Sequence, residues 1–95
     1  MLQRPSAGAA ILIDWAWAEY KLGRRERAAV ILLHESHRFP ASEALAYDLA
    51  IVLASLDRLP EARDWLARAF EVAKEPDRLK LRALEEAELQ AVWTE

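Results

Sequence analysis

The chain has 95 residues, of which 54% are apolar and 31% are charged, with a formal net charge of −3 and no cysteine. This length suits one small domain, and a chain without cysteine has no disulfide framework and no thiol nucleophile. The mixed charge argues against nucleic-acid binding, which needs a basic surface, and against a disordered tail.

The longest apolar run covers residues 7–18 and is interrupted by Asp14. It is too short to span a membrane, and the aspartate inside it makes it a poor secretory signal. We therefore expect a cytoplasmic location, with neither a membrane nor a nucleic acid as partner.

Alanine and leucine are the most frequent residues and there are only two glycines. This composition favours α-helix, because alanine and leucine lose little conformational freedom in a helix. Glycine tends to end helices and proline to begin them, and the chain is divided by Gly23, Pro40, Pro60 and Pro76. The sequence predicts five helices, at about residues 6–21, 24–37, 42–56, 60–74 and 77–93.

Ser6 and Ser42 stand where a serine oxygen can accept a hydrogen bond from a first-turn amide, so both are suitable N-caps. The expected connections are only a few residues long. Consecutive helices should therefore pack antiparallel to one another.

A shift of 34 residues aligns the two halves of the chain. The phrase LGRRERAA at 22–29 returns as LDRLPEAR at 56–63. Small residues align with small ones and turn with turn: Ala10 with Ala44, Ala16 with Ala50, Leu22 with Leu56, Ala28 with Ala62, and Leu32 with Leu66. A helix–turn–helix unit with a 34-residue period is typical of tetratricopeptide repeats.

The chain resembles a tetratricopeptide-repeat (TPR) protein with two repeats, at about 9–42 and 43–76, and a capping helix at about 77–93. Positions that match the family pattern are the small residues Ala16, Ala50, Ala28, Ala62 and Ala69, the turn residues Gly23 and Asp57, the large Leu32 and Leu66, and the closing Pro40. Glu35 stands where the family has a small residue, and Pro76 arrives two residues late. The resemblance implies that residues 1–95 form one all-α domain, an antiparallel helix-hairpin stack (a TPR-like α-solenoid) of five helices.

The two ends of the expected stack differ. The last helix alternates leucines with a charged face, as a capping helix requires. The first helix is apolar almost all the way round until Glu19, and such a helix is normally covered on all sides. We expect a self-association face at Ile11, Leu12 and Trp15, with contact to another protein or to a further repeat as alternatives. A third alternative is that the tryptophans only shield the core and some apolar surface stays exposed.

The resemblance also implies a function without catalysis: binding of a peptide or a partner helix in a concave groove. The implied groove residues are Ile13, Asp14, Trp17, Tyr20, Lys21, Tyr47, Asp48, Ile51, Arg78 and Arg82, and the cap would add Leu81 and Glu85. Aromatic anchors with a few charges suit protein recognition, although Trp17 and Tyr47 fit a core role equally well.

One TPR subclass holds the C-terminal carboxylate of chaperones with a clamp of Lys, Asn, Asn, Lys and Arg. Ile13, Trp17 and Asp48 depart from its first three positions, and only Arg78 and Arg82 resemble the last two. We therefore do not expect this chain to bind chaperone tails in that way.

The alternative of another class is a small helical metal-binding protein or enzyme. His34 and His37 are three residues apart on one predicted helix, a spacing at which two imidazoles can share a metal ion. Asp14 and Asp48 occupy equivalent places in the two repeats and could act as an acid–base pair. Histidines at a helix end and solvated aspartates explain these residues more simply, and we expect no enzyme activity, no cofactor and no metal.

Overall fold

The computed structural model describes residues 5–94, and the side chains of residues 12–93. This part of the chain contains helices and no strand. The elements are α1 (Pro5–Lys21), α2 (Arg25–Ser36), α3 (Glu43–Ser55), α4 (Leu59–Val72), α5 (Pro76–Glu85), the 3-10 turn η1 (Ala87–Leu89) and α6 (Gln90–Thr94).

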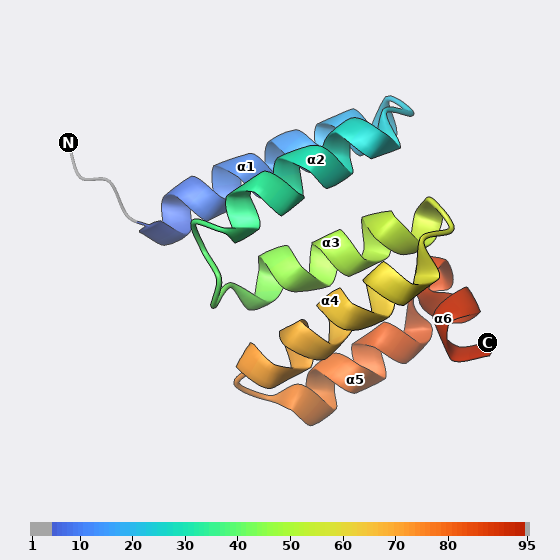
Figure 1. Cartoon of the computed structure of the whole chain (residues 1–95). Helices are drawn as coiled ribbons and strands as arrows, with labels where there is room; N and C mark the ends of the chain where they lie inside the picture. Colours follow the sequence, from blue (N-terminus) through green and yellow to red (C-terminus); the bar gives the residue numbers. More distant parts are fainter. Residues whose placement is uncertain (1–4, 95) are drawn as a thin grey trace.

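Consecutive helices run antiparallel and lie side by side, in the order in which they occur along the chain (Figure 1). The central helix is α3, which contacts α2 and α4 extensively and also meets α1 and η1. The predicted all-α class and antiparallel hairpins are thus confirmed. No helix in the described part of the chain combines the length and the hydropathy needed to cross a membrane.

The α1–α2 and α3–α4 turns have the same structure, 34 residues apart. Gly23 and Asp57 both have left-handed backbones, with φ of 87° and 63°. In each turn, this residue and the next donate amide hydrogen bonds three and five residues back: Gly23 to Tyr20 (3.0 Å), Arg24 to Glu19 (2.9 Å), Asp57 to Ala54 (3.0 Å) and Arg58 to Leu53 (3.0 Å). This is the Schellman pattern that closes a helix. The predicted turn positions are confirmed, and the two hairpins share one local geometry.

The N-cap prediction is confirmed at α3, where the Ser42 hydroxyl accepts the Leu45 amide at 3.2 Å. Helix α1 begins at Pro5, one residue before Ser6, whose side chain lies outside the described side chains.

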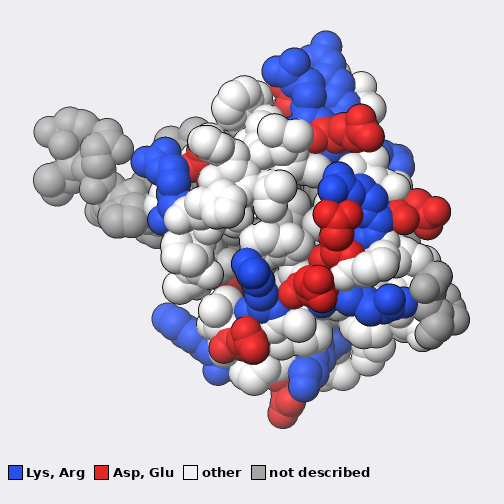
Figure 2. Space-filling model, viewed as in Figure 1, with Lys and Arg blue, Asp and Glu red and all other residues white. Residues whose placement is uncertain are grey.

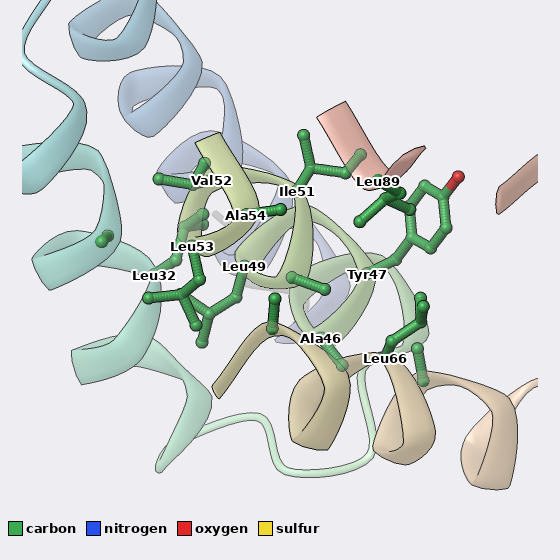
Figure 3. Packing of buried hydrophobic residues seen from close by; sticks show 14 of the residues in the cluster. Leu32, Ala46, Tyr47, Leu49, Ile51, Val52, Leu53, Ala54, Leu66 and Leu89 are labelled. Carbon is green, nitrogen blue, oxygen red and sulfur yellow. The ribbon is translucent and has the colours of Figure 1, made fainter. Parts of the chain in front are cut away.

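The core lies where the helices approach most closely. Ala16, Ala28, Ala50 and Ala62, the small residues singled out from the sequence, are all at most 1% exposed. Large side chains fill the space between the backbones: Leu32, Leu49 and Leu53 lie close together, and Leu66 lies apart from them near Tyr47 (Figure 3). Alanines thus let the helices approach closely, and leucines provide most of the buried apolar surface.

The prediction of one helix at 77–93 is wrong, because the chain breaks at Glu86, whose backbone is extended (φ −77°, ψ 125°). Leu79 and Ala83 form the buried stripe of α5. An unbroken helix would turn about 100° per residue and place Leu89 roughly 120° away from that stripe, with Gln90 directed at the core. The break buries Leu89 completely instead. It yields six helices, and the Gln90 amide caps the carbonyls of Leu84 (2.8 Å) and Glu86 (3.2 Å).

Helix α5 covers α4 less completely than a capping helix should. Leu81 and Leu84, two leucines of the predicted capping helix, are 65% and 53% exposed. The C-terminal α6 lies against the ends of α4 and α5, where Val92 is buried (Figure 1). The end of the stack is therefore closed by α5, η1 and α6 together.

Candidate binding site on α1, α3 and α5

The site begins with a contact between α1 and α3. The Trp17 indole N–H donates a hydrogen bond to the Asp48 carboxylate at 3.1 Å. The Tyr20 ring meets Trp17 edge-on, with ring centroids 4.8 Å apart, and the Arg25 guanidinium lies 5.2 Å from the Tyr20 ring centre. Five of the predicted groove residues lie on these two helices and define what we call the α1–α3 face: Trp17, Tyr20, Tyr47, Asp48 and Ile51.

Burial raises the pKa of Asp48 above its ordinary value. The hydrogen bond from Trp17 and the positive charge of Arg82 lower that pKa, while the carboxylate of Glu86 raises it, so the loss of hydration prevails. Asp48 is therefore a half-buried carboxylate that is held in place by the indole of α1.

An open cleft of about 290 Å³ lies between α3 and α5. Its lining residues are Glu43, Ala44, Tyr47, Asp48, Leu79 and Arg82. The Arg82 guanidinium lies 4.9 Å from the Tyr47 ring centre. This cation–π contact holds the Arg82 side chain against one wall of the cleft. We call this feature the α3–α5 cleft.

The α3–α5 cleft continues toward the α4–α5 turn into a second hollow of about 260 Å³. Lys74, Arg78 and Arg82 line it at intervals of four residues, opposite Glu43. Arg78 pairs with Glu75 at 3.2 Å, but both side chains are largely in water, so this pair contributes little to stability. The cations thus remain accessible to a negatively charged group.

The chain's own C-terminal segment covers the other end of the α3 surface. The Tyr20 hydroxyl and the Glu88 carboxylate are hydrogen-bonded at 3.4 Å. Leu89 lies beside Ile51 and Tyr47, and the three side chains are at most 4% exposed (Figure 3). The resemblance placed Tyr47 and Ile51 in an open groove, but the protein's own C-terminal segment largely covers both side chains.

The Tyr47 hydroxyl is buried and points away from the leucine cluster (Figure 3). Among the described residues no group completes a hydrogen bond to it with good geometry. Burial, followed by the nearby Glu86 carboxylate, raises the pKa of Tyr47 to about 12. The hydroxyl thus stays protonated and can act as a donor.

The other predicted groove residues lie at the edge of this surface. Ile13 is half-buried and packs on the core, whereas Asp14 and Lys21 are exposed. Arg78 and Arg82 line the clefts described above. The structure therefore brings together the aromatic residues, Asp48 and the two arginines, and leaves Asp14 and Lys21 in solvent.

The expected self-association face is only partly described, because the Ile11 side chain lies outside the described side chains. Leu12 is half-buried, and Trp15 is 49% exposed while its indole N–H donates to Glu19 at 3.3 Å. Glu19 is itself buried and pairs with Arg24 (3.3 Å) and Arg27 (3.6 Å). A network of Glu19 with the two arginines thus covers part of the outer surface of α1, and the Trp15 indole is hydrogen-bonded to it.

A second exposed apolar surface lies on α2, where Val30 and Leu33 are 65% and 43% exposed. On the side of the molecule seen in Figure 2, positive and negative side chains are interspersed, and an uncharged area lies over α2 and α3. This surface was not identified from the sequence.

The candidate metal and acid–base residues lie in different surroundings. His34 and His37 are exposed, and no group of three His, Cys, Asp or Glu side chains within residues 12–93 is placed to hold a metal ion. Glu35 is buried and pairs with Arg38 at 3.3 Å and more distantly with His34 at 3.9 Å. Asp48 bonds to Trp17, and its charged neighbours are Arg82 and Glu86.

Sequence reasoning missed the site residues Glu43, Glu86, Glu88 and Leu89. It placed the last three on a continuous capping helix, where they would lie far from α1. A signal was present: Leu89 and Val92 are out of phase with the stripe of Leu79 and Ala83. That change of phase indicates a break, but not where the chain goes after it.

The chain matches no family model, no curated protein and no solved structure. The resemblance to TPR proteins therefore rests on the residues and spacings given above. Function has to be argued from the geometry of the site.

Proposed function

We propose that this protein is a non-catalytic interaction module that binds a peptide or helical segment of another protein in the α3–α5 cleft. The observation that carries the proposal is the cleft itself, which is open to solvent and combines an aromatic floor with charged walls. Tyr47 and Leu79 lie at the base of the cleft and are only 2% and 4% exposed, so the accessible polar contacts come from Arg82, Asp48 and Glu43. Such a mixture is typical of protein recognition surfaces.

The TPR-like architecture belongs to the same proposal. Its support is the 34-residue spacing of two identically closed hairpins, whose turns lie at Gly23 and Asp57. In TPR proteins the first helix of each repeat lines the binding surface, and α1, α3 and α5 would hold those positions here. On this proposal α3 provides the floor of the cleft and α5 its basic wall.

The experiment uses Ala44, an exposed residue of α3 that lines the cleft. Peptides are first selected from a random displayed library on the immobilised full chain, and their affinities are then measured by fluorescence anisotropy. Ala44→Trp should weaken binding at least tenfold, because the indole fills the space that a ligand needs. Ala67→Trp, at an exposed position of α4, is the matched control and should leave binding unchanged.

Removing the guanidinium with Arg82→Ala should also weaken binding, through loss of the cation beside Tyr47. Selected peptides that bind the Ala44→Trp and wild-type chains equally would contradict the cleft as the site. A selection that enriches no peptide would contradict the proposed function.

A second candidate function is self-assembly through α1. The observation that favours it is Trp15, whose large side chain is half-exposed at the end of the stack. Exposed tryptophans are frequent anchors of protein interfaces.

A further inference from the structure

The α3 surface of the binding site extends beyond the open cleft. Glu43, Ala44, Tyr47 and Asp48 follow one side of α3 from its N-terminus and line the cleft. The next residue along that side is Ile51, which is covered by Leu89 of the C-terminal segment (Figure 3). The C-terminal segment therefore covers α3 beyond the residues that line the cleft.

Residues 86–89 read Glu-Ala-Glu-Leu and make three kinds of contact. The Glu86 carboxylate and the Arg82 guanidinium are both charged neighbours of Tyr47 and Asp48. The carboxylate of Glu88 is hydrogen-bonded to the Tyr20 hydroxyl across 68 residues of sequence. Between these polar contacts, Leu89 is completely buried on α3. Two tyrosines on neighbouring helices thus face two glutamates, and an apolar hollow between the helices holds the leucine.

The segment is joined to α5 through a single extended residue, Glu86. In the described part of the chain, Leu89 is followed by the five-residue α6. The Trp93 indole donates to the Ala83 carbonyl at 3.4 Å, and Trp93 itself is 38% exposed. Rotation about Glu86 would free η1 and α6 without unwinding α5.

We propose that the α1–α3 face recognises a partner segment of the chemistry glutamate, any residue, glutamate, leucine, and that residues 86–89 are an internal competitor for this ligand. The inference goes beyond the proposed function, since it names a class of partner for the part of the α3 surface that adjoins the open cleft. A tethered segment acts at a millimolar effective concentration. An external ligand therefore binds well only when the internal copy is weakened or displaced.

The test uses the full chain and a fluorescent peptide with the sequence of residues 84–94. Leu89→Ala in the protein weakens the internal segment at its buried anchor. The peptide should bind this variant at least tenfold more tightly than wild type, as measured by anisotropy. Leu59→Ala is the matched control, because it also removes a buried leucine side chain, but in α4. It should bind the peptide no better than wild type does.

Peptide chemistry provides a second control. A peptide with both glutamates changed to lysine should lose at least tenfold in affinity for the Leu89→Ala chain. If the peptide binds the Leu59→Ala chain as well as the Leu89→Ala chain, binding reflects general loosening of the fold and the inference is wrong. If it binds neither, and circular dichroism shows both chains folded, the inference is also wrong.

Glu88→Lys keeps the proposal testable if Leu89→Ala does not fold. Glu88 is only half-buried, and its recorded contact is the Tyr20 hydroxyl. This variant should bind the peptide more tightly than wild type does, and adding Tyr20→Phe should weaken that binding about tenfold, because a hydrogen bond to a charged carboxylate is lost. An unchanged affinity in Tyr20→Phe would contradict the assigned register.

Ala44→Trp separates this inference from the proposed function. It fills the open cleft but does not touch the surface under Leu89. If Ala44→Trp weakens binding of the library peptides and the C-terminal peptide binds no variant, the cleft is supported as the binding site and the inference is wrong. If the C-terminal peptide binds the Leu89→Ala chain and no library peptide depends on Ala44, the inference stands and the cleft is not the site.

Discussion

Asp48 shows how one residue links packing to electrostatics in this protein. Its carboxylate is half-buried beneath α1 and accepts the Trp17 indole N–H. Because burial raises the pKa of Asp48, the native state holds its proton more tightly than the unfolded chain does. Stability from this group is then greatest below the unfolded pKa of about 3.9, and it falls as pH rises through the higher folded pKa.

Asp48→Asn should therefore raise the thermal midpoint at pH 7, since the amide oxygen can still accept from Trp17 without a charge to desolvate. The gain should shrink as pH falls through the folded pKa and vanish below about 3.9, where Asp48 is protonated in both states. Thermal unfolding followed by circular dichroism from pH 3 to pH 8 checks this. Asp14→Asn, at an exposed position of α1, is the control and should change the midpoint little. A lower midpoint for Asp48→Asn at pH 7 would contradict the argument.

At the residue scale the sequence predicted part of the site. It singled out Trp17, Tyr20, Asp48 and Arg82 as groove residues, and the structure places them around one surface. It could not show that Glu86 and Glu88 belong to that surface, because their contacts span about 40 and 68 residues and depend on a backbone break. The sequence of a helix does not distinguish a glutamate in solvent from a glutamate that contacts a tyrosine of a distant helix.

At the scale of elements, the two hairpin turns offer a matched pair of substitutions. Gly23 and Asp57 have equivalent left-handed backbones, but only glycine adopts this conformation without cost. A Cβ added at Gly23 would meet no atom within 4 Å, so the penalty there is conformational.

Gly23→Ala should lower the free energy of unfolding by about 1–2 kcal/mol. Asp57→Gly should raise it, by about 0.5 kcal/mol, because relief of strain is partly offset by the greater freedom of glycine in the unfolded chain. Urea denaturation measures both values. Changes of the same sign at the two positions would show that the turns are not equivalent in energy.

The C-terminal elements show where a periodic pattern stops being informative. Leu79 and Ala83 predict α5 correctly, and the apolar residues after Glu86 predict helical structure as well. The prediction failed at the junction, because polar caps and the burial of Leu89 on α3 favour a break that no local pattern requires.

At the scale of the whole molecule, the two ends of the stack are closed differently. The far end is covered by α5, η1 and α6, whereas α1 ends in the Trp15–Glu19 contact, with Arg24 and Arg27 on the carboxylate. Trp15 remains half-exposed beside this network. It is the residue through which the second candidate function, self-assembly, is best tested.

The self-assembly candidate predicts that the molar mass from light scattering rises toward that of a dimer with increasing concentration. Trp15→Lys should return the protein to a folded monomer, since the ammonium removes the apolar contact and can pair with Glu19. Leu81→Lys, at an exposed site on α5, is the control and should not change the mass. A monomer at every concentration would exclude self-assembly through α1 and leave the binding site unaffected.

The sequence by itself determined the helical class, the antiparallel hairpins and the two turns, because these depend on local signals. Alanine and leucine at helical spacing favour helices, and Gly23 and Asp57 end them at fixed places. The tertiary structure alone decided that the chain breaks at Glu86 and that Leu89 fills the α1–α3 face. The change of phase after Ala83 indicates a break, but its position and the surface that Leu89 then covers depend on which buried surfaces meet across the whole chain.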